Sequence, residues 1–88
     1  MNETEENWHQ AFTILSELLP QTELFESLFE QYYTLIESDS IYVPSARALI
    51  LSFYPDSVPN LKLKLLLRAR KASDDVRNRI KIQLSELT

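Results

Sequence analysis

Few residues in this chain could do chemistry: one histidine, thirteen carboxylates and several serines, among 88 residues that include no cysteine and no glycine. A serine nucleophile needs a base within hydrogen-bond reach. The sole histidine, His9, lies beside Trp8 near the chain start, where we expect a surface position. Adjacent acids such as Asp74 and Asp75 point about 100° apart on a helix, so they do not form a facing catalytic pair. These residues predict a protein that is not an enzyme.

The same residues argue against bound metals and nucleotide cofactors. Without cysteine there is no thiolate ligand for zinc, and a single histidine excludes multi-histidine centres. Phosphate-binding loops and the calcium loop of helix–loop–helix proteins need glycine, which is absent. We therefore expect no cofactor and no catalytic, cofactor-binding or metal-binding residue.

Length and hydrophobic periodicity predict a single helical domain over residues 1–88. A content of 44% hydrophobic and 25% charged residues is typical of a folded domain of this size. Apolar residues recur every three or four positions in three segments, which predicts helices over 4–19, 22–37 and 44–54. The predicted core contains Trp8, Phe12, Leu15, Leu28, Tyr32, Leu49, Phe53, Leu65, Ala69, Val76 and Ile80.

The carboxyl-terminal segment has two interpretations. From Val58 onward, apolar residues follow one another at an average step of about 3.6, the repeat of an α-helix, which predicts one helix over 59–87. Ser73 followed by two acids is also typical of a helix start, which would divide the segment near Ser73. We favour the single helix, the longest of the four, with a bend near Ser73 as a variant. The predicted fold class is all-α, an antiparallel four-helix bundle.

Charge is distributed unevenly, although the net charge is only −4. Residues 1–40 contain nine carboxylates and no Lys or Arg, whereas residues 41–88 contain all nine basic residues and four acids. Either the two halves neutralise one another across the fold, or each presents a single-signed surface to a partner. The predicted second helix has an acidic ridge that we expect to face solvent, formed by Glu23, Glu26, Glu30 and Glu37.

One group of residues departs from the core stripe and is the candidate site. Leu63 and Leu67 are one helical turn apart and lie roughly 140–180° around the helix from the stripe that begins at Val58. The predicted partner-binding residues are Leu63, Lys64, Leu67, Arg70 and Lys71. Apolar side chains among basic ones suit an acidic partner helix or an anionic membrane surface. Alternatively, both leucines pack beneath the third helix or the 55–59 connection.

Three short stretches are similar to those of a known family. They are Tyr32–Glu37, Tyr42–Pro44 and Leu49–Leu51, accompanied by an acidic second helix, a third helix started by proline and a basic carboxyl-terminal segment. In these respects the chain resembles the bacteriocin immunity proteins of the enterocin A immunity type. The resemblance implies a non-enzymatic cytoplasmic protein that protects a producer cell from a pore-forming peptide. The implied partner is a membrane sugar-transport receptor with bound bacteriocin, engaged from inside the cell.

The competing interpretation is a small regulatory or adaptor bundle that binds another protein, with a homodimer as one form. An isoelectric point of about 4.9 and the lack of a glycine turn argue against nucleic acid as the partner. The acidic amino terminus lacks the features of a secretory signal, and no stretch approaches the ~18 apolar residues of a spanning helix. We expect a cytoplasmic protein, with peripheral contact at the inner face of the membrane as a further expectation.

Overall fold

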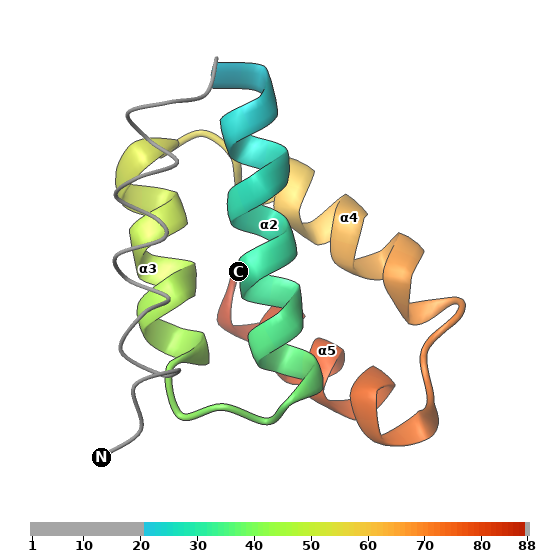
Figure 1. The fold of residues 1–88 in the computed structure, drawn as a ribbon. Coiled ribbons are helices and arrows are strands. Elements are labelled where there is room, and N and C mark those ends of the chain that lie inside the picture. The colour runs from blue at the N-terminus through green and yellow to red at the C-terminus, as the bar shows by residue number, and fades with distance from the viewer. Residues whose placement is uncertain (1–20, 88) are drawn as a thin grey trace.

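Four helices make up the part of the chain that the computed structural model describes, residues 21–87 (Figure 1). This part contains no strand, so the all-α prediction is confirmed. The helix predicted over 4–19 lies outside the described residues. The four helices are α2 (Gln21–Glu37), α3 (Val43–Phe53), α4 (Val58–Ala69) and α5 (Asp74–Glu86).

Helix α2 is the central element of this arrangement. It contacts both α3 and α5, and α5 in turn contacts α4. Figure 1 shows α3 beside α2 and running in the opposite direction, while α4 and α5 form a V whose apex is the turn between them. Short connections place α3 against α2 and α5 against α4. The packing within residues 21–87 is of the all-α, four-helix class that the sequence predicts, although two of these four helices come from the segment predicted as one helix over 59–87.

The carboxyl-terminal segment consists of two helices, so the favoured single helix over 59–87 is wrong and the division near Ser73 is correct. The longest of the four described helices is α2, with 17 residues. The Ser73 hydroxyl accepts a hydrogen bond from the Val76 amide at 3.3 Å, which caps the start of α5. The spacing of apolar residues continues across the turn, and periodicity alone therefore does not reveal the break.

Arg77 stabilises the turn between α4 and α5. Its Nε donates to the carbonyl oxygen of Ala69 at 3.0 Å, and its Nη2 donates to that of Ala72 at 3.1 Å. Its Nη1 donates to Oδ1 of Asp74 at 3.1 Å. The last carbonyls of a helix lack partners within the helix and carry partial negative charge. The guanidinium group therefore satisfies the end of α4 and holds α5 folded back against it.

The core lies where α2 meets the other helices. Four of the predicted core residues are buried: Leu28, Tyr32, Leu65 and Ile80. Three more are partly buried and pack against them: Leu49, Ala69 and Val76. Three others lie outside the described residues: Trp8, Phe12 and Leu15. The buried faces predicted for α2, α4 and α5 are thus confirmed at these positions.

Phe53 does not belong to the core as predicted, because its side chain is 44% exposed. The buried line of α3 passes through Ala46 and Ile50, and the next residue along that line is Tyr54. The Tyr54 ring meets Phe25 edge-on, with 5.3 Å between the ring centroids. At about 100° per residue, Phe53 and Tyr54 point to opposite sides of Ile50, and it is Tyr54 whose ring meets α2.

The carboxyl end of α2 is closed by its own backbone and by an arginine of α5. Asp39 has a φ of 55°, the left-handed conformation common after a helix, and its amide donates to the Ile36 carbonyl at 3.1 Å. Arg79 donates from Nη1 to the Glu37 carbonyl at 2.9 Å, and its Nε lies 3.7 Å from Oδ1 of Asp39. The arginine thereby fixes the α2–α3 connection against α5.

Candidate functional site

The outer face of α4 presents a patch of exposed leucines. Leu63, Leu66 and Leu67 are 57%, 52% and 51% exposed, whereas Leu61 and Leu65 on the same helix are fully buried. At about 100° per residue, the three exposed leucines occupy an arc of about 100° on the side opposite the buried pair. This exposure excludes the alternative that the predicted leucines pack beneath α3 or the 55–59 connection.

Leu66 belongs to this patch, although the sequence prediction omitted it. It follows Leu63 by three residues, and side chains at this spacing are neighbours on a helix surface. A helical projection centred on the buried Leu61 and Leu65 would have placed it on the outer side. Of the six large apolar side chains exposed within residues 21–87, three are these leucines.

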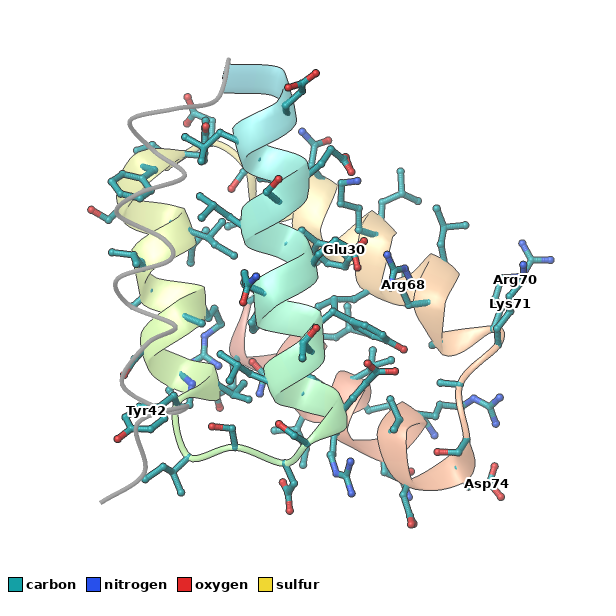
Figure 2. All side chains as sticks on the ribbon, in the orientation of Figure 1. Glu30, Tyr42, Arg68, Arg70, Lys71 and Asp74 are labelled. Atoms are coloured by element: carbon teal, nitrogen blue, oxygen red, sulfur yellow. The ribbon has the colours of Figure 1, made fainter. Side chains whose placement is uncertain are left out.

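Lys64, one of the predicted partner-binding residues, is paired with a carboxylate of α2. Its Nζ forms an ion pair with the Glu26 carboxylate. Arg68, one turn later, pairs with Glu30, and Figure 2 shows these two side chains close together. Both cations also lie 5.4 Å from the centroid of the Phe29 ring, within the range of a cation–π interaction. Glu26 and Glu30, two members of the acidic ridge of α2, therefore pair with cations of α4 instead of facing only solvent. The two charged halves therefore neutralise one another here.

Arg70 and Lys71 are exposed residues of the turn that follows α4. Figure 2 shows both side chains projecting from this turn, away from α2. Within residues 21–87, neither forms an ion pair. Together with Leu67 and Arg68 they line a hollow at the end of the leucine patch. The hydrogen bonds of Arg77 fix the turn, so the two cations are held beside the leucines.

We use the term α4 surface for the leucine patch and the nearby cations that form no ion pair within the described residues. The α4 surface consists of Leu63, Leu66, Leu67, Lys62, Arg70 and Lys71. Residues 58–73, which include α4 and the turn, contain no acidic residue. The surface can therefore bind an apolar group by excluding water and attract negative charge at its edges.

No protein-family model, curated protein or solved structure matches this chain. Among residues 21–87, no group of three or more His, Cys, Asp or Glu side chains could hold a metal ion. None of the four described helices has both the length and the apolar character needed to cross a bilayer.

Two other hollows, both lined by residues of the described part of the chain, lie away from the α4 surface. One is lined by Phe25, Phe53 and Tyr54, where α3 ends and α4 begins. The other lies between the α2–α3 connection and α5, where Ile41 and Ile82 are 78% and 59% exposed. Asp39 and Arg79, which form an ion pair, also line this second hollow. Its two isoleucines provide matched control positions for the exposed leucines of α4.

Proposed function

We propose that this protein is a non-enzymatic interaction protein that binds a partner protein through the α4 surface. The observation that supports this is a group of three neighbouring exposed leucines on a helix whose opposite face is buried. Exposed apolar patches with polar edges are typical of binding sites. On association, such apolar residues become anchors that supply much of the binding energy, while charges at the rim guide the encounter.

Within that role, we propose that the protein is a cytoplasmic bacteriocin immunity protein that protects a producer cell from a pore-forming peptide. The partner would be a membrane sugar-transport receptor with bound bacteriocin, engaged at the inner face of the membrane. The support is the resemblance of Tyr32–Glu37, Tyr42–Pro44 and Leu49–Leu51 to the enterocin A immunity type. A regulatory or adaptor bundle that binds another protein is the competing proposal, and the α4 surface suits both.

Nucleic acid is a poorer partner for the basic residues. Binding to a phosphate backbone requires several cations that are free to contact phosphates. Within the described part of the chain, five of the basic residues already pair with carboxylates: Arg47, Lys64, Arg68, Arg77 and Arg79. Only four cations stay unpaired there, and three of them, Lys62, Arg70 and Lys71, lie around the exposed leucines rather than in a continuous phosphate-binding stripe.

Survival of a bacteriocin-sensitive strain tests the proposed function. Cells that express the protein should survive a pore-forming bacteriocin that kills the parent strain. The double variant Leu63→Ser/Leu67→Ser should stay folded, because exposed substitutions usually change stability by less than about 0.5 kcal/mol each, but it should no longer protect. The control variant Ile41→Ser/Ile82→Ser removes two exposed apolar residues elsewhere and should protect fully.

Each result separates the alternatives. Full protection by a stably folded Leu63→Ser/Leu67→Ser variant would contradict a role for the α4 surface. Failure of the unaltered protein to protect, combined with leucine-dependent binding of another protein, would favour the adaptor proposal. Loss of the helical circular dichroism signal in the serine variant would instead show that the leucines stabilise the fold.

A further inference from the structure

We infer that the segment which docks on the α4 surface is an acidic amphipathic helix of the partner protein. This rests on the proposed function, because it names the chemistry of the partner that the α4 surface binds. The spacing of the leucines favours a helix, and the charge around them favours an acidic one. The net negative charge of the whole molecule disfavours an anionic bilayer as the partner of the α4 surface.

The leucine patch has the spacing against which a second helix can pack. Leu63, Leu66 and Leu67 occupy positions i, i+3 and i+4, which form a ridge on the helix surface. With twelve residues, α4 is about 18 Å long, so a partner helix of three turns can lie along it. In that position α4 would be buried on both of its apolar faces, one against the core and the other against the partner.

The charges around the patch favour an acidic partner. Residues 58–73 contain no acid, and neither Arg70 nor Lys71 forms an ion pair within residues 21–87. Lys62 adds a further positive charge next to Leu63. Glutamates or aspartates beside the partner's apolar strip would be attracted to these cations, whereas lysines would be repelled.

A second copy of this chain fits the α4 surface poorly. In a two-fold symmetric dimer the same patch faces itself across the axis. The cations Lys62, Arg70 and Lys71 of one copy would then surround those of the other, with no acid on α4 to separate them. Like charges placed together at an interface oppose association.

An anionic bilayer fits poorly for another reason. A bilayer is an extended surface that meets a whole side of the molecule, so it responds to the net charge of −4 as well as to the local cations. A helix about 10 Å across meets mainly the charges within a Debye length of about 8 Å.

Binding of synthetic peptides to the full-length protein tests this inference. An acidic peptide of about 20 residues presents leucines at i, i+3, i+4 and i+7 between glutamates, and a matched basic peptide has lysine in place of each glutamate. By fluorescence anisotropy, the acidic peptide should bind in the micromolar range and the basic peptide at least about tenfold more weakly. Leu63→Ser/Leu67→Ser should weaken binding of the acidic peptide by about tenfold or more.

Charge variants and vesicles complete the experiment. Arg70→Glu/Lys71→Glu should weaken binding of the acidic peptide and reduce its dependence on salt, because the attractive charges are gone. Ile41→Ser/Ile82→Ser, the control, should bind as the unaltered protein does. Vesicles of phosphatidylglycerol should sediment no more protein than vesicles of phosphatidylcholine.

Several results would overturn the inference. Equal affinity for the two peptides, or no binding of either, would exclude an acidic helix as the occupant. Sedimentation with phosphatidylglycerol that depends on Leu63 and Leu67 would identify a bilayer, and dimerisation with the same dependence would identify a second copy. If the serine variant loses protection while the acidic peptide does not bind, the proposed function stands and only this inference fails.

Discussion

Gln83 of α5 accepts, at its Oε1 atom, a hydrogen bond from the buried hydroxyl of Tyr32 on α2 at 2.7 Å. The same oxygen accepts a second bond from Nη1 of Arg47 on α3 at 2.6 Å, and Nη2 of Arg47 lies 3.6 Å from a carboxylate oxygen of Glu86. One side-chain amide thus links three helices. A buried polar group that loses its partner is costly, so this network favours one relative placement of α2, α3 and α5.

Replacement of Gln83 by methionine should lower the free energy of unfolding by about 1–3 kcal/mol. Methionine has a similar length but is a weak acceptor, so Tyr32 and Arg47 lose their shared partner. Urea denaturation followed by circular dichroism measures the change. The control Lys81→Met, at an exposed position of the same helix, should stay within about 0.5 kcal/mol of the unaltered protein. A Gln83→Met variant as stable as this control would show that the network contributes nothing.

Stability should fall at alkaline pH because of Tyr32. Burial raises the pKa of its hydroxyl to about 12, although the Arg47 guanidinium acts in the opposite direction. An unfolded tyrosine titrates near pH 10, so the folded protein holds this proton more tightly. The raised pKa of Tyr32 contributes roughly 2–3 kcal/mol to the free energy of unfolding. This contribution is fully present below about pH 10 and is lost as the pH rises to about 12.

Comparison with Tyr32→Phe isolates this effect from the titration of other groups. Urea denaturation of both proteins between about pH 9 and pH 12 gives their difference in free energy of unfolding at each pH. The stability of the unaltered protein relative to Tyr32→Phe should fall across this range. A difference that does not change with pH would contradict a raised pKa of Tyr32.

The α4–α5 junction should depend on Arg77. Arg77→Met removes the donors to the Ala69 and Ala72 carbonyls and should cost about 1–2 kcal/mol. Arg77→Lys should retain only part of this stability, since an ammonium group lacks the several fixed N–H donors of the guanidinium. Hydrogen exchange should show lost protection in the first turn of α5 before the rest of the molecule. Unchanged protection there would show that Ser73 capping alone maintains the turn.

The orientation of α4 is tested by two adjacent leucines. Leu65→Ala should lower the free energy of unfolding by about 2–5 kcal/mol, because Leu65 is fully buried. Leu66→Ala makes the same chemical change at a position that is 52% exposed and should cost less than about 1 kcal/mol. Thermal denaturation of both variants gives the comparison. Equal losses would indicate that α4 is rotated about its axis relative to this structure.

The buried faces of the helices could be predicted from the sequence because they depend on local periodicity. Leu28 and Tyr32 are one turn apart on α2, and Leu61 and Leu65 are one turn apart on α4, so each pair must share a face once the helix forms. The outward position of Leu63 and Leu67 follows from the same geometry. It needs no knowledge of which helix covers the opposite side.

The break at Ser73 could not be settled in this way. Two helices with the same repeat continue the same spacing across a short turn, so a single helix accounts for the apolar positions equally well. Bonds from Arg77 back to Ala69 and Ala72, and the packing of α5 against α2, decide in favour of two. These contacts join residues whose proximity exists only after the chain has turned.

The sequence by itself determined the all-α class, the division of charge and the apolar faces of α2, α4 and α5, since these depend on residue type and spacing. Only the tertiary structure decided which cations pair with carboxylates of the described residues and which can still attract an acidic partner. Packing of α4 beside α2 places Lys64 against Glu26, whereas Arg70 and Lys71 lie beyond the end of α4 and form no ion pair within residues 21–87. Ion pairing needs charged atoms within about 4 Å. For residues far apart in the chain, that distance is set by helix packing rather than by sequence spacing.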